Sequence, residues 1–90
     1  MDISLINLSK EIKQTLIEKK LSLACAESCT GGMLSSYITQ VSGSSKYFQK
    51  GYITYSNDAK IKDLGVNPET IEKFGAVSEQ TALEMLSGLD

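Results

Sequence analysis

The chain has 90 residues, enough for one small domain with a modest hydrophobic core. Its formal charge is −2, from 9 basic and 11 acidic residues spread along the sequence, so the concentrated basic face typical of nucleic-acid binding is not expected. No apolar run approaches the roughly 20 residues of a membrane span, and the N-terminus lacks a signal-peptide pattern. We therefore expect a cytoplasmic protein that binds neither nucleic acid nor membrane.

The N-terminal segment, residues 3–20, predicts an amphipathic helix, because its apolar residues recur at helical spacing. The expected buried stripe consists of Leu5, Leu8, Ile12 and Leu16, widened by Ile6 and Ile17. A helix of this kind usually packs against a sheet, so we assign it a structural role.

Two strands and a helix are expected next. Residues 21–26 are short, mostly apolar and alternating, which is typical of a buried strand, and residues 30–41 carry apolar side chains at helical spacing. After a polar loop at 42–45, residues 47–55 are rich in aromatic and β-branched side chains, which favours a second strand.

Three short helices complete the expected order. The first covers 59–64 and is closed by Gly65, the second begins at 67–68, and the last covers 78–87. Alternation of helices and strands predicts an α/β fold. Because two strands make a thin sheet, either a further short strand exists, for example around Val77, or the fold is incomplete.

The cysteine and histidine content narrows the chemistry. Cys25 and Cys29 are expected to be free thiols in a cytosolic protein, and without histidine a metal site is not expected. The absence of histidine also excludes Ser-His-Asp and Cys-His catalysis within this chain, so a general base would be Lys, Tyr, Asp or Glu.

Polar and small residues gather at 24–32, where the first strand is expected to turn into a helix. Ser28 lies there beside Glu27, and small residues let a backbone approach a ligand. The free N–H groups at the start of a helix favour an anion or oxyanion, here those of Thr30, Gly31 and Gly32. The alternative is purely structural, since Ser and Thr are common N-caps and glycine often occurs at such junctions.

A second strand–helix junction lies at 55–60. If the two strands are parallel neighbours, both junctions meet at one sheet edge, where ligands bind in open α/β sheets. Ser28 would then face Tyr55 and Lys60. A serine needs a base to become a nucleophile, and a lysine can serve when its surroundings favour the neutral amine.

The sequence allows more than one role for the other side chains at these junctions. Tyr55 could relay or position the proton, and Glu27 could orient Lys60 or bind substrate. The structural alternatives are a strand-end aromatic for Tyr55 and a solvated surface position for Lys60, like its neighbour Lys62. The functional interpretation depends on both motifs occurring together in a chain without histidine.

Three segments of the chain resemble one known family. The segments are Ala26–Gly32 (A-E-S-C-T-G-G), Gly51–Lys60 (G-Y-I-T-Y-S-N-D-A-K) and Leu64–Val66, and the similarity runs from about Leu5 to Leu86. They are similar to the C-terminal domain of CinA, the competence/damage-inducible protein, whose stand-alone versions are nicotinamide-nucleotide amidases (PncC). The resemblance implies a three-layer α/β/α sandwich with a mixed sheet.

The resemblance also implies an activity. The family hydrolyses the carboxamide of nicotinamide mononucleotide, giving nicotinate mononucleotide and ammonia, with a serine nucleophile and neither metal nor cofactor. Carried onto this chain, it implies that Ser28 is the nucleophile and that Tyr55 and Lys60 activate it. Residues expected to shape the site and bind substrate are Glu27, Thr30, Gly31, Gly32 and Asn57.

The chain departs from the family in length. Family domains are nearly twice as long, and a T-G-I-A-G-P segment that helps form their substrate pocket has no counterpart in residues 1–90, which we therefore interpret as a single, partial domain. Besides a nicotinamide mononucleotide amidase, the alternatives are an inactive remnant that binds nucleotides and an oligomerising interaction module. A homo-oligomer or a complementing fragment is the expected partner.

Overall fold

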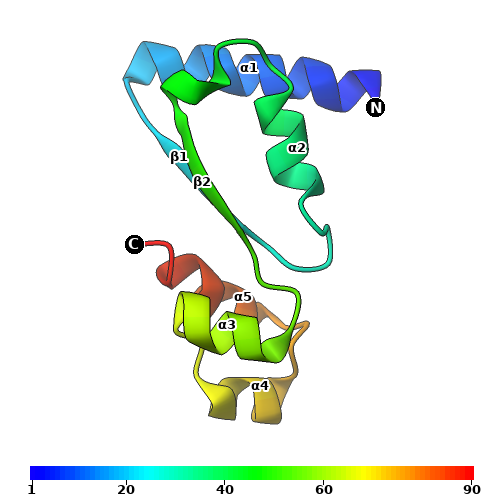
Figure 1. Cartoon of the computed structure of the whole chain (residues 1–90), viewed down its shortest axis with the longest axis vertical. Coiled ribbons are helices and arrows are strands. Elements are labelled where there is room, and N and C mark those ends of the chain that lie inside the picture. Colours follow the sequence, from blue (N-terminus) through cyan, green and yellow to red (C-terminus); the bar gives the residue numbers. More distant parts are fainter. The chain divides into compact units, whose positions relative to one another are not determined.

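The computed structural model describes all of residues 1–90, as five α-helices, one short 3-10 helix and two strands. The elements are α1 (Ile3–Lys19), β1 (Leu23–Glu27), α2 (Met33–Thr39), η1 (Ser44–Lys46), β2 (Phe48–Ile53), α3 (Asn57–Leu64), α4 (Pro68–Phe74) and α5 (Glu79–Ser87). Figure 1 shows this order along the ribbon. The α/β class expected from the sequence is confirmed.

The chain divides into two compact units. Unit 1 consists of Met1–Cys25 and Gly32–Gly51, and unit 2 of Ala26–Gly31 and Tyr52–Asp90. Each unit therefore contains a part of both strands, and each is described below by itself.

The two strands pair with each other and run parallel. Near their starts, the Leu23 N–H donates to the Tyr47 carbonyl (2.7 Å); at their ends, the Thr54 N–H donates to the Glu27 carbonyl (2.9 Å). Both partners advance along the chain together, which is the parallel arrangement. Parallel strands need a long crossover connection, and here α2 lies within it.

The core of unit 1 is formed by Cys25, Ile38 and Tyr47. Helix α1 contributes Leu16 to this core, whereas Leu5 and Leu8 remain 42% and 50% exposed. The expected stripe is therefore wrong at its N-terminal end. Helix α2 does reach the N-terminal end of α1, where the Asp2 N–H donates to the Tyr37 hydroxyl (2.9 Å), but the residue of α1 that is buried is Ser9 and not Leu5 or Leu8.

Helix α2 begins three residues later than the sequence predicts. Gly31 and Gly32 have positive φ angles of 59° and 104°, a conformation that a right-handed helix cannot include. The two glycines form a turn after the strand, and the helix begins only at Met33.

Tyr47 has a buried hydroxyl that makes no hydrogen bond. The residue is 2% exposed. Burial raises the pKa of Tyr47 above its usual value of 10.0, because ionisation inside the core is unfavourable.

We expect Tyr47→Phe to raise the free energy of unfolding by about 1 kcal/mol, since it removes a buried hydroxyl that makes no hydrogen bond. The difference in unfolding free energy between the variant and wild type should widen above pH 10. The pKa of Tyr47 is raised in the folded state, so wild type loses stability as pH rises past the pKa of the unfolded chain, whereas the phenylalanine variant does not. Urea denaturation at pH 7 and pH 10.5 measures both effects. A less stable phenylalanine variant at pH 7 would contradict this prediction.

Unit 2 has its own core of Leu64, Val66 and Met85. Helices α3, α4 and α5 pack together there (Figure 1), and each start follows a capping residue, although α3 begins at Asn57, two residues before the sequence predicts. The caps are Ser56, Asn67 and Ser78, each accepting a backbone N–H of the first turn. Gly88 also needs to be glycine, because a Cβ there would collide with the Leu64 carbonyl.

No third strand forms around Val77, contrary to one of the two possibilities left by the sequence. Val77 is 84% exposed and lies in the bend between α4 and α5. Gly75 just before it has a φ of 90° and ends α4, while Ser78 just after it caps α5, so too few residues remain for a strand.

Glu84 joins α5 to the start of α4. Its carboxylate accepts the Thr70 hydroxyl (2.6 Å) and the Asn67 N–H (2.8 Å). These two hydrogen bonds, that of Thr70 first, lower the pKa of Glu84 below its usual 4.5.

Because this folded-state pKa is lowered, Glu84 stabilises the fold above about pH 4.5, and the stability is lost as pH falls through the lower value. Glu84→Gln should therefore flatten the acid limb of the unfolding free energy against pH. Chemical denaturation between pH 3 and pH 6 tests this, with Glu72→Gln, an exposed position on α4, as control. Parallel acid limbs for wild type and Glu84→Gln would refute the assignment.

No helix of the chain is both long and apolar enough to span a lipid bilayer.

Candidate functional site

The two sequence motifs meet at the ends of the paired strands. The Thr54 N–H donates to the Glu27 carbonyl at 2.9 Å, and the next residue along each strand is Tyr55 or Ser28. All four residues belong to unit 2. The condition for the two junctions to share one sheet edge is met, because β1 and β2 are parallel neighbours.

Lys60 is buried at this edge. Its side chain is 1% exposed, and its Nζ donates to the carbonyls of Thr54 (2.8 Å) and Tyr55 (3.1 Å). The end of β2 therefore holds the lysine through main-chain atoms. Buried lysines are rare in proteins unless they are paired, so this position is not the solvated surface site that was the structural alternative.

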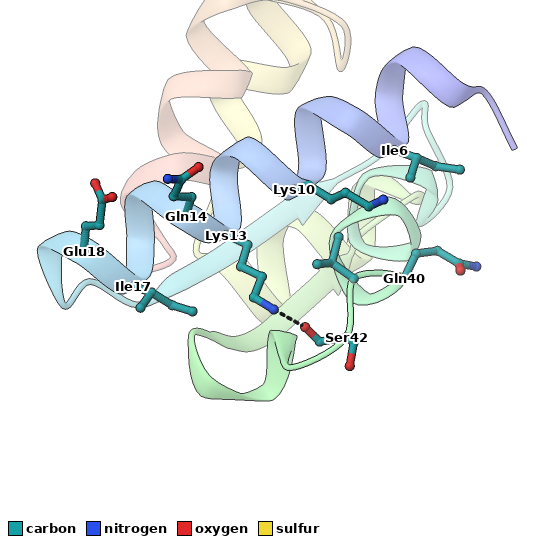
Figure 2. A pocket seen from close by; sticks show the side chains of 9 residues that line it. Ile6, Lys10, Lys13, Gln14, Ile17, Glu18, Gln40 and Ser42 are labelled. Atoms are coloured by element: carbon teal, nitrogen blue, oxygen red, sulfur yellow. Dashed lines mark hydrogen bonds between the residues drawn. The ribbon is translucent and has the colours of Figure 1, made fainter.

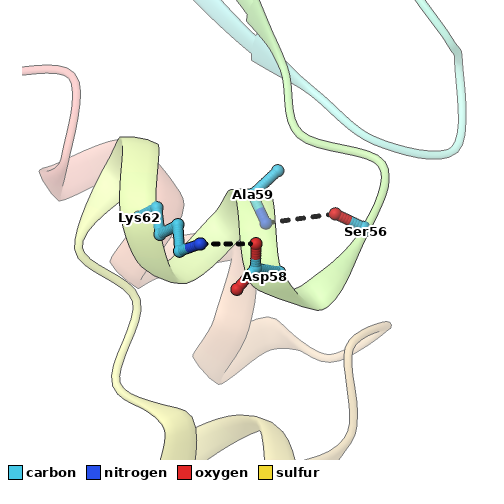
Figure 3. Close-up of polar contacts among 4 residues, drawn as sticks. All are labelled: Ser56, Asp58, Ala59 and Lys62. Atoms are coloured by element: carbon cyan, nitrogen blue, oxygen red, sulfur yellow. Dashed lines mark hydrogen bonds and ion pairs between the residues drawn. The ribbon is translucent and has the colours of Figure 1, made fainter.

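The neighbouring lysine shows what a surface position in the same helix looks like. Lys62 is largely exposed and forms an i,i+4 ion pair with Asp58 at 3.1 Å (Figure 3). Ser56 accepts the Ala59 N–H at 3.1 Å and fixes the first turn of α3 (Figure 3). Residues two positions apart on a helix face different directions, which agrees with a buried Lys60 and an exposed Lys62.

Glu27 fixes the turn that follows β1. It is 3% exposed, and its Oε1 accepts the Thr30 hydroxyl at 2.8 Å. The Gly31 N–H donates to the Ser28 carbonyl at 3.0 Å and closes the same turn. This corrects part of the expected oxyanion site, because the Gly31 N–H already has a local partner; Gly32 belongs to unit 1.

The remaining predicted side chains are not joined to one another. Ser28 is half-buried, Tyr55 is 73% exposed, and Asn57 is exposed at the first position of α3. No hydrogen bond links the Ser28 hydroxyl or the Tyr55 phenol to Lys60, which contacts Tyr55 through the backbone only.

Thr54 is the residue that sequence reasoning missed. Its N–H binds Glu27, its carbonyl binds Lys60, and its own hydroxyl is buried without a hydrogen-bond partner. The contacts to Glu27 and Lys60 use the main-chain N–H and carbonyl of Thr54, so they cannot be predicted from its residue type. The only signal was position, because Thr54 directly precedes the second motif.

The cysteines and acidic residues do not form a metal site. Cys25 is buried, Cys29 is exposed, and both thiols are free, as the sequence predicts. No group of three or more Cys, Asp or Glu side chains is placed to hold a metal ion.

A cavity of about 590 Å³ in unit 1 lies apart from these motifs in the sequence. It is formed by α1 and the segment that follows α2, where the Lys13 Nζ donates to the Ser42 carbonyl at 2.7 Å (Figure 2). None of the motif residues lines it.

Comparison with known families decides the relationship. Residues 5–90 match the model of the CinA C-terminal domain. The chain belongs to the CinA family. Among its relatives is a CinA-like protein of Chlorobium limicola, 56% identical over 82 residues, which are 91% of this chain and 19% of that protein.

Solved CinA-family structures have the same fold. The competence/damage-inducible protein CihA of Agrobacterium tumefaciens matches with a TM-score of 0.95 and 42% identity, over 98% of this chain and 53% of that one. A CinA superfamily protein of Escherichia coli matches with a TM-score of 0.91 and 37% identity, over 98% and 52%. The chain thus spans about half the length of these solved relatives and about a fifth of the curated ones.

Proposed function

We propose that the chain carries the catalytic residues of a nicotinamide-nucleotide amidase, with Ser28 as nucleophile and Lys60 as its base. The observation that carries this proposal is the burial of Lys60, held by the carbonyls of Thr54 and Tyr55 at the edge where the serine-bearing strand ends. A lysine kept out of water beside a serine junction, in a chain without histidine, supports serine–lysine chemistry.

The hydrogen bonds of Lys60 are compatible with a role as base. A neutral amine has two N–H donors and one lone pair. The two carbonyls of Thr54 and Tyr55 accept two N–H bonds, which leaves the third position on the nitrogen for a lone pair or a proton. Proton uptake and release at that position need no change in either of the two existing bonds.

In the proposed reaction, the Ser28 hydroxyl attacks the carboxamide carbon of nicotinamide mononucleotide while Lys60 takes its proton. The tetrahedral intermediate collapses to an acyl-serine, and the same proton leaves with the amino group as ammonia. Water then attacks the ester, giving nicotinate mononucleotide and free Ser28. Glu27, Thr30 and Asn57 are the proposed substrate-binding side chains, with Tyr55 positioned at the exposed end of the strand.

The test is incubation of the purified chain with nicotinamide mononucleotide, with ammonia and nicotinate mononucleotide measured in parallel. Equimolar release of both products supports the proposal. Nicotinamide, which has the same carboxamide but no ribose phosphate, serves as the control substrate and is expected to react far more slowly. Absence of both products, alone and after addition of the second half of a CinA-family domain as a separate polypeptide, would refute it.

The second candidate is an interaction module in which residues 1–90 are one partial domain that associates with another copy or with a complementing fragment. Its support is the apolar surface of unit 2, where Val77, Leu83 and Leu86 are 84%, 57% and 62% exposed. Exposed apolar residues in such number favour association. Sedimentation across a concentration series tests this, and a monomer at every concentration would contradict it.

A further inference from the structure

Two hydrogen bonds close the turn that carries Ser28. The Thr30 hydroxyl donates to the Glu27 Oε1 at 2.8 Å, and the Gly31 N–H donates to the Ser28 carbonyl at 3.0 Å. Ser28 thus lies between two residues whose side chains bind each other across it. We propose that the Glu27–Thr30 hydrogen bond positions Ser28 for attack, an inference that rests on the amidase function proposed above.

The main chain of Glu27 is tied to the lysine side of the site. Its carbonyl accepts the Thr54 N–H at 2.9 Å, and the Thr54 carbonyl accepts an N–H of the Lys60 Nζ at 2.8 Å. Glu27 is therefore joined to the serine turn by its side chain and to the proposed base through one intervening residue. All of these residues belong to unit 2. A shift of the turn relative to Glu27 changes the distance between the Ser28 hydroxyl and the Lys60 amine.

The turn needs a side-chain constraint because it is open to solvent and contains a glycine. Cys29 and Thr30 are exposed, and Gly31 has a φ of 59°. Glycine loses more conformational freedom on ordering than any other residue, so one main-chain hydrogen bond holds such a turn weakly. The hydroxyl bound to a buried carboxyl group adds a second constraint across the same residues. Misplacing a reacting group by about 1 Å can cost roughly a hundredfold in rate, so this constraint affects catalysis.

The burial of Glu27 favours positioning over direct contact with substrate as the main effect of this pair. The residue is 3% exposed and its Oε1 binds Thr30, so little of the carboxyl group is accessible to a ligand. The two roles predict different kinetics. Loss of a positioning contact lowers kcat and leaves KM nearly unchanged, whereas loss of a substrate contact raises KM.

The test compares Thr30→Val, which removes the hydroxyl at an exposed position, with Thr30→Ser, which retains it. Thr30→Val should lower kcat for nicotinamide mononucleotide by about tenfold and change KM by less than about twofold, and Thr30→Ser should recover most of the lost kcat. Thr70→Val is the matched control, because it removes the threonine–glutamate hydrogen bond to Glu84 in the same unit (2.6 Å) and should leave kcat unchanged. A raised KM with normal kcat in Thr30→Val, or equal losses in Thr30→Val and Thr70→Val, would overturn the proposal.

Hydrogen exchange separates this inference from the amidase function itself. After correction for intrinsic rates, the Gly31 N–H should exchange about fivefold faster in Thr30→Val than in wild type, because its turn has lost the side-chain constraint. The Gly65 N–H is the internal control, since it donates to the Ile61 carbonyl at the same 3.0 Å from an exposed glycine with a φ of 68°, and its exchange should not change.

The two measurements together distinguish the possible failures. Unchanged exchange of the Gly31 N–H in Thr30→Val would refute the positioning role, whether or not the chain turns over substrate. Faster exchange combined with full activity of Ser28→Ala would refute the proposed function and confirm only the constraint on the turn.

Discussion

Replacing Ser28 by alanine should lower ammonia release from nicotinamide mononucleotide by about a thousandfold or more, because the variant has no hydroxyl to form the acyl intermediate. The fold should be unaffected, since the half-buried Ser28 hydroxyl makes no hydrogen bond to the buried Lys60 and its carbonyl, which accepts the Gly31 N–H, is retained. Steady-state ammonia release and circular dichroism measure the two expectations.

Cys29→Ala is the matched control for this variant. Cys29 is the adjacent residue, is exposed, and carries the other nucleophilic side chain of the turn. Its replacement should leave most of the activity. If Cys29→Ala removes the activity and Ser28→Ala does not, the nucleophile is the thiol and the assignment of Ser28 is wrong.

If Lys60 is the proposed general base, Lys60→Arg should lower ammonia release from nicotinamide mononucleotide by about a hundredfold or more, the usual loss when such a base is removed. Arginine keeps the positive charge but does not release a proton near neutral pH, and its planar head does not fit the two carbonyl acceptors of Thr54 and Tyr55 in the same way. Single-turnover acylation with excess enzyme isolates the step in which the base acts.

Lys62→Arg is the control, because Lys62 lies in the same helix but on its exposed face. It should change neither the turnover nor, beyond about 0.5 kcal/mol, the free energy of unfolding. Thermal unfolding of Lys60→Arg shows whether the buried site tolerates the larger head group. Near-normal turnover in a folded Lys60→Arg variant would make Lys60 a positioning cation and not a base.

The sequence predicted where helices and strands occur better than it predicted which side of a helix is buried. Capping residues such as Ser56 and Asn67 act locally, so helix starts in unit 2 could be predicted from residue types alone. The buried side of α1 depends on where its partner helix lies, which no local pattern records. Ser9 is the buried residue of α1, and Leu5 and Leu8 were therefore assigned wrongly.

Similar reasoning applies to the candidate site. From the sequence, the parallel pairing that brings the two motifs to one edge was only a condition, and the structure meets it. The contacts that hold Lys60 and close the turn at Gly31 use main-chain atoms, which look the same for every residue type. For that reason Thr54, whose backbone joins both motifs, could not be recognised from its side chain.

Unit 2 is built from two separate segments of the chain, and this favours an order in which they fold. Residues 26–31 join residues 52–90 only across the intervening connection, and the Glu27–Thr54 hydrogen bond closes a loop of about 27 residues at an entropic cost of roughly 3 kcal/mol. Helices α3, α4 and α5 are contiguous in sequence and need no such closure. They can form first, so that Lys60 is already in its helix when the segment bearing Ser28 arrives, and the proposed catalytic pair is completed last.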